Sequence, residues 1–351
     1  MSAIGIDCRK IDHYGIGNVV KVVVECLSGS SFLPVLFGNP SVILRFFPKA
    51  RVVPFFRHHN DPFAFISLNK ILQKTFEIDC FIAPHYVGVW SLGQKSHHIP
   101  IVMFLYDFIQ VKHNRSFLKK IIHKSIIYNS VKSADLIVVP CENTKSEGEK
   151  FGFNTLGWEV LALPVKKIFL SCPEFSKEEF YLCVTSSDKA HKGINNLLKI
   201  WKTSYPQLLV VGNLSSGRFA GKSNVRLLGN VTDDELVKLY AQAKWLVIPS
   251  IDEGYGYCFL ESRYTYTPVI SRPLPSFHAF KTSADIFSHD FSDDAFKIAI
   301  EKSFVSDSRV NKEEFKLVQE RFDIRHFKSK LISLLNWVLH ACYSSRLDLS
   351  S

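Results

Sequence analysis

The sequence predicts an α/β protein with two domains, each built on a parallel sheet. Two segments, residues 3–27 and 245–271, follow the order strand, glycine-containing loop, helix, which is typical of parallel sheets. A length of 351 residues favours two domains over one. Hydrophobic residues make up 46% of the chain and include 29 Phe, so we expect packed cores and exclude a disordered protein.

The segment 245–271 is the most informative part of the chain. Residues 245–248 form a short apolar run that predicts a buried strand, and one proline, one serine and two glycines turn the chain into a loop over residues 249–256. A helix is expected over residues 257–264, and a second short strand follows near residues 268–270. Ligands bind beyond the carboxyl ends of parallel strands, so we expect the loop to contact a ligand.

Two carboxylates belong to this segment, Glu253 on the loop and Glu261 on the helix. Gly254 and Gly256, on either side of Tyr255, allow a ligand to approach the backbone closely. The helix N-terminus favours phosphate, whereas carboxylates accept hydrogen bonds from sugar hydroxyls. Together these groups suit a nucleotide-sugar; the alternative is a solvated acidic loop before a helix.

The N-terminal segment has a similar order, with a strand over residues 3–6 and a helix over residues 19–27. The turn between them contains Asp7, Arg9, Gly15, Ile16 and Gly17. The dinucleotide-binding pattern G-x-G-x-x-G lacks its third glycine, because Val20 occupies that place. An ordinary tight turn is therefore the alternative to a phosphate-binding loop.

Three further strands end in polar side chains. A strand over residues 99–105 leads into Tyr106 and Asp107, and a strand over residues 180–184 is followed by Lys192. A cation there would stabilise the charge that develops on a departing diphosphate, although an exposed surface lysine is the alternative. His85 follows a strand over residues 80–83, and we expect a packed loop residue rather than a general base.

The stretch E-G-Y-G-Y-C-F-L-E at residues 253–261 resembles the signature E-G-F-G-x-P-x-x-E of retaining GT-B glycosyltransferases of family 4 (glycosyl transferases group 1), which includes many bacterial lipopolysaccharide and capsule enzymes. The resemblance implies a GT-B fold, with two Rossmann-like domains facing a cleft and a C-terminal helix crossing back to the N-terminal domain. We expect an acceptor domain at residues 1–168, a nucleotide-sugar donor domain at 169–326 and the returning helix at 327–351.

The resemblance also implies roles for particular residues. The candidate catalytic residues are Glu253, which would contact the transferred sugar, Asp107 and Tyr106. The candidate donor-binding residues are Glu261 for the ribose, Lys192 for the diphosphate, and Gly254, Tyr255, Gly256, Gly15, Ile16 and Gly17 near the phosphates.

Four positions depart from the family pattern. Tyr106 stands where the family usually has His, Cys258 where it has Pro, and Tyr266 where it has Gly. Ser186 stands where the family usually has Arg, and Lys189 would supply the missing positive charge. These departures motivate an alternative, a non-catalytic sugar-binding or partner-binding protein.

The predicted function is retaining transfer of a sugar, with mannose as one candidate, in cell-surface polysaccharide synthesis. The donor would be GDP-mannose or a UDP-sugar, and the acceptor a glycan or a lipid-linked glycan. The sequence contains no D-x-D motif, so we expect no bound metal and no cofactor other than the donor.

Composition narrows the partners and the compartment. A net charge of +10 favours an anionic partner, but the Phe residues fall in core-like patterns, so we do not expect nucleic-acid binding. None of the eight Cys form C-x-x-C pairs, which indicates a reducing compartment. No signal peptide or membrane span is expected either, so the predicted location is cytoplasmic, with the inner face of the plasma membrane as a peripheral site.

A basic amphipathic segment at residues 112–132 leaves two possibilities open. Its apolar side chains share one helical face, and its lysines and histidine lie on the other: Phe117, Leu118, Ile121 and Ile122 against Lys119, Lys120, His123 and Lys124. An ordinary surface helix would bury the apolar face, whereas a membrane-surface helix would use both faces to bind anionic lipid.

Overall fold

The computed structural model describes residues 1–13, 15–61, 63–74, 78–87, 99–173, 175–185, 187–215 and 221–348. The chain forms two units, which are described separately. Unit 1 contains residues 1–164 and 324–351, and unit 2 contains residues 165–323. These limits lie within a few residues of the expected domain boundaries at 168 and 326.

Unit 1 is built on a seven-stranded parallel sheet in the order β3-β2-β1-β4-β5-β6-β7. The strands are β1 (Ser2–Asp7), β2 (Phe32–Gly38), β3 (Arg51–Pro54), β4 (Cys80–Ala83), β5 (Ile101–Phe104), β6 (Leu136–Val139) and β7 (Trp158–Val160). Most are short apolar runs that are buried on both faces, which is characteristic of a parallel sheet covered by helices.

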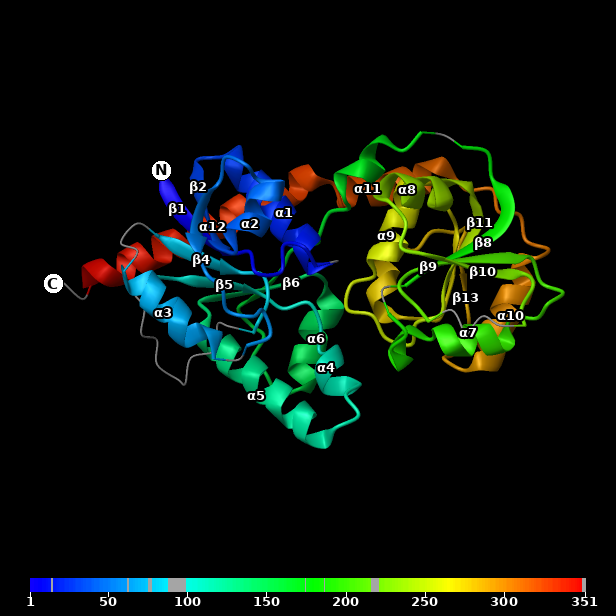
Figure 1. The fold of residues 1–351 in the computed structure, drawn as a ribbon, viewed down its shortest axis with the longest axis horizontal. Helices are drawn as coiled ribbons and strands as arrows, with labels where there is room; N and C mark the ends of the chain where they lie inside the picture. The colour runs from blue at the N-terminus through cyan, green and yellow to red at the C-terminus, as the bar shows by residue number, and fades with distance from the viewer. Residues whose placement is uncertain are drawn as a thin grey trace. The chain divides into compact units, whose positions relative to one another are not determined.

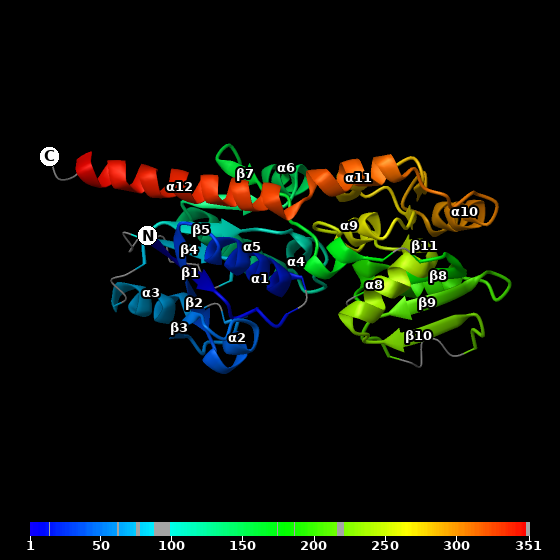
Figure 2. The ribbon, with the colours of Figure 1, turned by 90° about the horizontal axis from the view of Figure 1, so that it is seen from above.

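Helices cover both faces of this sheet (Figure 1). They are α1 (Ile16–Ser28), α2 (Pro40–Phe46), α3 (Ala64–Lys74), α4 (Ile109–Lys112), α5 (Phe117–Ser133), α6 (Glu142–Lys150) and α12 (Ile324–Asp348). Apolar residues of α3, α4 and α5 pack on one face of the sheet. The C-terminal helix α12 lies beside α1 in unit 1, although the two helices are far apart in the sequence (Figure 2).

Unit 2 contains a six-stranded parallel sheet in the order β10-β9-β8-β11-β12-β13. Its strands are β8 (Glu178–Val184), β9 (Gln207–Val211), β10 (Val225–Gly229), β11 (Ala243–Ile248), β12 (Val269–Ser271) and β13 (Ile286–Phe287). Its α-helices are α7 (Ile194–Ile200), α8 (Asp233–Gln242), α9 (Tyr257–Tyr264), α10 (Asp293–Ser303) and α11 (Lys312–Arg321). Short 3-10 helices occur at Lys167–Ser171, Ala190–Lys192 and Pro275–Phe280.

Local sequence signals explain several of these elements. Thr232 and Glu235 form a capping box, a signal that the sequence contains, at the start of α8, and α9 has the bounds expected from the sequence. The apolar residues 160–165 predict the last strand of the first domain, but the structure places β7 at Trp158–Val160, so this prediction is wrong for most of the range. The sequence of residues 217–223 resembles a phosphate-binding P-loop, although residues 216–220 lie outside the described residues. A P-loop leads directly into a helix, whereas the strand β10 follows this segment, so the segment is not a P-loop.

Both sheets reverse their strand order at one position. In unit 1, the chain runs from β1 to β3 toward one edge and from β4 toward the other, and unit 2 repeats this between β8 and β11. The loops that follow β1 and β4 therefore diverge at the carboxyl edge of the sheet in unit 1, and the loops that follow β8 and β11 diverge in the same way in unit 2. Such a switch point is where open α/β sheets bind ligands.

Candidate active site

Lys192 and Glu253 meet at the switch point of unit 2. Lys192 follows β8 and Glu253 follows β11, and the two strands are neighbours in the sheet. The Lys192 Nζ lies 2.7 Å from Glu253 Oε2 and 2.8 Å from Oε1, and Ser250 Oγ donates a hydrogen bond to Oε1 at 2.7 Å. Both ionic side chains are partly shielded from solvent. The structure thus brings together two residues that the sequence separates by 61 positions.

Backbone packing holds these two loops against each other. The amide of Ile251 donates to the carbonyl of His191 at 2.8 Å. Gly193 has a positive φ of 67°, and a Cβ at this position would lie 2.1 Å from the carbonyl oxygen of Pro249. Only glycine permits this approach, which explains why glycine follows Lys192.

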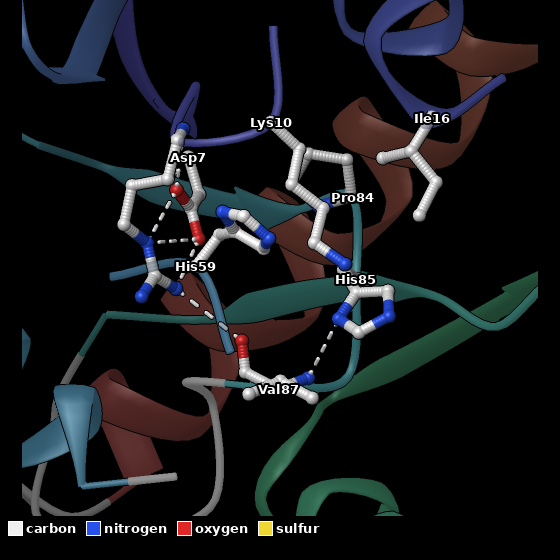
Figure 3. A pocket seen from close by; sticks show the side chains of 8 residues that line it. Asp7, Lys10, Ile16, His59, Pro84, His85 and Val87 are labelled. Atoms are coloured by element: carbon white, nitrogen blue, oxygen red, sulfur yellow. Dashed lines mark hydrogen bonds and ion pairs between the residues drawn. The ribbon is translucent and has the colours of Figure 1, made fainter. Parts of the chain in front are cut away.

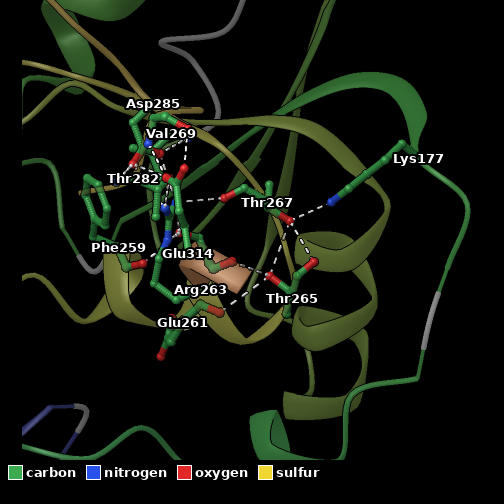
Figure 4. Close-up of polar contacts among 12 residues, drawn as sticks. Lys177, Phe259, Glu261, Arg263, Thr265, Thr267, Val269, Thr282, Asp285 and Glu314 are labelled. Atoms are coloured by element: carbon green, nitrogen blue, oxygen red, sulfur yellow. Dashed lines mark hydrogen bonds and ion pairs between the residues drawn. The ribbon is translucent and has the colours of Figure 1, made fainter. Parts of the chain in front are cut away.

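A buried ion pair anchors helix α9, which carries Glu261. The Nη1 and Nη2 atoms of Arg263 each lie 3.0 Å from an oxygen of Asp285, and both side chains are fully buried (Figure 4). Arg263 also donates to the carbonyl of Thr267, while Asp285 accepts from the amide of Val269. These bonds tie α9 to β12 and to the segment before β13, so the helix is held from several sides.

Glu261 is almost completely buried, with 1% of its surface exposed. The hydroxyl of Tyr240, on α8, donates to Glu261 Oε2 at 2.8 Å. Burial raises the pKa of Glu261 to about 7, and the hydrogen bond from Tyr240 partly opposes the rise. Near neutral pH this carboxyl group is therefore partly protonated. Its predicted contact with a ribose stays a prediction.

The structure accounts for two departures from the family pattern. Cys258 is the second residue of α9, and the amide of a residue at this position has no hydrogen-bond partner within the helix. Pro and Cys are therefore both compatible with the fold. The Cys258 thiol lies 3.7 Å from the carbonyl oxygen of Val184. Tyr266 has a positive φ of 52°, a conformation that favours glycine. Its ring stacks on Phe315, with the ring centroids 5.8 Å apart. Ser186 lies outside the described residues.

The loop residues 254–256 lie between Glu253 and α9. Gly256 is the N-cap of α9, with φ 94°, and Tyr255 is buried, with its ring packed edge-on against Phe280. Gly254 is partly exposed. Tyr255 is therefore a core side chain, and only the backbone of this segment can serve a ligand as predicted.

A small pocket lies at the switch point of unit 1 (Figure 3). It is lined by Asp7, Arg9, Lys10, Ile16, His59, Pro84, His85 and Val87. Arg9 donates to both oxygens of Asp7, with Nη2 2.6 Å from Oδ2, and also to the carbonyls of His58 and Val87. Its guanidinium is thus committed to joining the loops that follow β1, β3 and β4.

The predicted residues of the N-terminal loop contribute in different ways. Gly15 is the N-cap of α1, and Ile16 lines the pocket. Gly17 is buried, and a Cβ there would lie 2.6 Å from the carbonyl oxygen of Ile11 and 2.7 Å from that of Lys10. This glycine lets α1 approach the loop after β1 closely, which holds the backbone of Lys10 at the pocket.

Tyr106 and Asp107 follow β5. The carbonyl of Tyr106 accepts a hydrogen bond from Thr144 Oγ1, and Asp107 Oδ1 accepts one from the amide of Ile109 at the start of α4. Burial lowers the pKa of Lys10, and the charge of Asp107 partly opposes this effect. Ile16 and Lys10 line the pocket, whereas Asp107 acts on Lys10 through its charge.

Comparison with known protein families identifies unit 2. Residues 168–303, which contain Lys192, Glu253 and Glu261, match the family model described as glycosyl transferases group 1. The match spans most of unit 2. The group of residues recognised from the motif at 253–261 therefore lies within a glycosyl transferases group 1 domain, as the sequence predicted.

A curated relative extends the comparison. The chain is 27% identical over 231 residues to the O-antigen chain mannosyltransferase RfbU of Salmonella typhimurium. The match covers 61% of this chain and spans 65% of the length of the relative.

Solved structures share the fold of this chain over nearly its whole length. The HepE protein of Anabaena, solved with UDP and glucose, has a TM-score of 0.75 at 14% identity and covers 96% of this chain and 100% of its own. The sucrose-phosphate synthase of Thermosynechococcus elongatus has a TM-score of 0.78 at 15% identity, covering 97% and 100%. The lipopolysaccharide outer core galactosyltransferase WaaB has a TM-score of 0.72 at 17% identity, covering 96% and 99%. The predicted GT-B fold class is confirmed.

Two residues of these sites were not predicted from the sequence: Lys10, which lines the pocket of unit 1, and Ser250, which binds Glu253. His59 and His85, which also line the pocket, belong to loops at residues 55–59 and 84–86 that the sequence marks as candidate acceptor-side loops. Ser250 lies three residues before Glu253 on the same loop, which is a signal the sequence contained. Lys10 had no such signal, because only the sheet order places it beside His59 and His85.

Two surveys of the described residues bear on cofactors and membranes. No group of three or more His, Cys, Asp and Glu side chains in this part of the chain could hold a metal ion. Across the same ranges, no helix combines the length and the apolar character needed to cross a bilayer.

Proposed function

We propose that the protein is a glycosyltransferase that moves a sugar from a nucleotide-sugar to a glycan or lipid-linked acceptor in cell-surface polysaccharide synthesis. The observation that carries this proposal is the Lys192–Glu253 pair at the switch point of a glycosyl transferases group 1 domain. The similarity to an O-antigen mannosyltransferase supports mannose, and thus GDP-mannose, as the donor. A UDP-sugar is the alternative donor.

The pair has the chemistry that the reaction needs. The bond between the anomeric carbon and the donor phosphate oxygen breaks, the acceptor oxygen bonds to that carbon, and the acceptor proton leaves with the diphosphate or the solvent. Lys192 would stabilise the negative charge on the departing diphosphate, and Glu253 would accept hydrogen bonds from the sugar hydroxyls. Because Glu253, which itself accepts a hydrogen bond from Ser250, already fixes the ammonium group, little reorganisation is needed when the charge develops.

Retention of configuration, independence from metals and a cytoplasmic location remain parts of this proposal that rest on the sequence pattern. Asp107 and Tyr106 in unit 1 would serve the acceptor and the sugar. Glu261 would bind the ribose through its carboxylate.

A thermal-shift panel of nucleoside diphosphates and nucleotide-sugars, without added metal, tests the donor site. A ligand that binds only the folded protein raises its melting temperature by mass action. We expect a shift for one base that is lost in Lys192→Ala and kept in Lys238→Ala, which removes an exposed lysine of α8 in the same unit. If no ligand shifts the folded protein, or if Glu253→Ala leaves the biological output unchanged, the non-catalytic alternative replaces this proposal.

We infer, in addition, that helix α5 contacts an anionic membrane. Its apolar residues Phe117 and Leu118 are 78% and 65% exposed, and Ile121 and Ile122 are 49% and 46% exposed. Ile126 and Ile127 face the core instead. An ordinary surface helix would bury its apolar stripe, so the exposed stripe favours the membrane alternative.

Charge complements this apolar stripe. The 17 residues of α5 include four lysines and a histidine but no Asp or Glu. Cations beside exposed aromatic and aliphatic side chains suit the interface of a bilayer that contains anionic lipid. A lipid-linked acceptor would be reached from such a surface.

Vesicle co-sedimentation tests the membrane contact. We expect binding to vesicles with phosphatidylglycerol, weaker binding at high salt, and little binding to pure phosphatidylcholine. The double variant Phe117→Ser, Ile121→Ser should bind poorly, whereas Leu156→Ser, which removes an exposed leucine elsewhere in unit 1, should bind like the parent protein. Equal binding of the two variants would rule out α5 as the contact.

A further inference from the structure

The pocket of unit 1 contains a cation that the fold does not use. Lys10 follows β1, and burial lowers its pKa to about 8, although the charge of Asp7 partly opposes this effect. Within the described parts of the chain, the Lys10 ammonium has no hydrogen bond or ion pair, whereas Arg9 beside it is fully engaged with Asp7. Lys10 therefore carries a positive charge at neutral pH that Asp7 and Asp107 influence through their charges and that no hydrogen bond or ion pair of the described chain engages.

His85 adds a neutral donor. Its Nδ1 accepts a hydrogen bond from the amide of Val87 at 3.1 Å, so the proton of the neutral ring resides on Nε2 (Figure 3). Burial holds the pKa of His85 well below its usual value, and the charges of Lys10 and Arg9 act in the same direction. The ring is thus an Nε2–H donor and is not available as a general base. Burial likewise lowers the pKa of His59 to about 4, so this ring is also neutral.

We propose that this pocket binds a phosphate-type anion of the acceptor, with the Lys10 ammonium and the His85 Nε2–H as its donors. A cation would not suit the pocket, because the carboxylate of Asp7 already accepts the bonds of Arg9. An ammonium and a fixed N–H donor at the carboxyl edge of a parallel sheet match a phosphate oxygen in charge and in hydrogen bonding.

The assignment to the acceptor rests on the proposed function and on the position of α5. Ser130, on the buried side of α5, donates to the carbonyl of Tyr86 at 2.7 Å. The loop that carries His85 is therefore attached to the helix that we infer contacts the membrane. A phosphate that links a glycan to a lipid would approach the pocket from that helix.

Isothermal titration of the full chain with inorganic phosphate tests the site independently of catalysis. We expect saturable binding that weakens about 10- to 100-fold in Lys10→Met, the range for loss of one charge-assisted hydrogen bond. Lys10→Arg should keep most of the affinity, and Lys49→Met, at an exposed site of the same unit, should keep all of it. Circular dichroism and the melting temperature establish that each variant is folded.

Two further titrations fix the source of the anion. The affinity for the nucleoside diphosphate chosen by the thermal-shift panel should be equal in the parent protein and in Lys10→Met. A parallel loss of that affinity would assign the pocket to the donor diphosphate and overturn the acceptor assignment. Tighter binding of acetate than of phosphate would overturn the phosphate assignment, and phosphate binding that is unchanged in Lys10→Met would overturn the site. The phosphate titration does not depend on catalysis, so an absence of transferase activity would contradict the proposed function without affecting the test of the phosphate site.

Discussion

The buried carboxyl group of Glu261 should make the stability of unit 2 depend on pH, and Glu261→Gln should remove this dependence. The pKa of Glu261 rises from 4.5 to about 7 on folding. Between these two values the folded state binds more protons than the unfolded state, so the free energy of unfolding falls as the pH rises. The difference corresponds to about 3 kcal/mol of stability that is present below pH 4.5 and lost above pH 7.

Glutamine keeps the shape of the side chain and an oxygen that accepts the hydrogen bond of Tyr240, but it cannot ionise. Glu261→Gln should therefore melt about 6–12 °C higher, relative to the parent protein, at pH 8 than at pH 5, since about 1 kcal/mol shifts a domain of this size by about 2–4 °C. Differential scanning calorimetry at the two pH values measures this. Glu313→Gln, at an exposed position of α11, is the matched control.

An equal difference between variant and parent at both pH values would refute the reasoning, because it would mean that Glu261 titrates alike in the folded and unfolded chain. Donor binding provides a second readout. Ribose hydroxyls would donate to the charged carboxylate, so nucleotide affinity should rise as the pH increases through about 7. This rise should be absent from Glu261→Gln, and its persistence there would place the ribose elsewhere.

Three other predictions concern unit 2. Lys192→Met should weaken nucleoside diphosphate binding about 10- to 100-fold, measured by isothermal titration, and an unchanged affinity would remove Lys192 from the donor site. Gly193→Ala should lower the free energy of unfolding by at least about 1–3 kcal/mol in urea, because its φ is 67° and its Cβ would clash, whereas Gly157→Ala meets no atom within 4 Å and should be nearly neutral. Asp285→Ala should cost about 3–5 kcal/mol by leaving Arg263 buried without its ion-pair partner; a loss below about 1 kcal/mol in the same assay would contradict the anchoring of α9.

The donor-binding segment of unit 2 could be predicted because the residues that form it are close together in the sequence. The strand β11, the glycine-containing loop and the helix α9 follow one another in the sequence, and each has its own marker: an apolar run, loop residues and helical spacing. Glu253 and Glu261 could therefore be placed on the loop and the helix. Their environments could not, since the burial of Glu261 depends on Tyr240 from α8.

The pocket of unit 1 was not predictable in the same way. Lys10, His59 and His85 belong to loops after three different strands, and only the strand order brings these loops together. Composition and spacing say nothing about that order.

The basic helix α5 is a different case, because the periodicity of its sequence shows that it has an apolar face and a charged face but not which of the two faces packs on the core. The structure buries Ile126 and Ile127 and leaves Phe117 exposed.

The departures from the family pattern carry less weight against catalysis than the sequence alone suggests. Cys258 occupies a position in the first turn of α9 that needs no amide bond, and Tyr266 adopts the backbone conformation of the usual glycine while its ring stacks on Phe315. The structure explains both substitutions by the backbone conformation at those positions. Neither residue belongs to the Lys192–Glu253 ion pair, and that ion pair is formed. Since catalysis depends on charge placed where it develops in the transition state, the preserved pair argues for a transferase more strongly than these two substitutions argue against one.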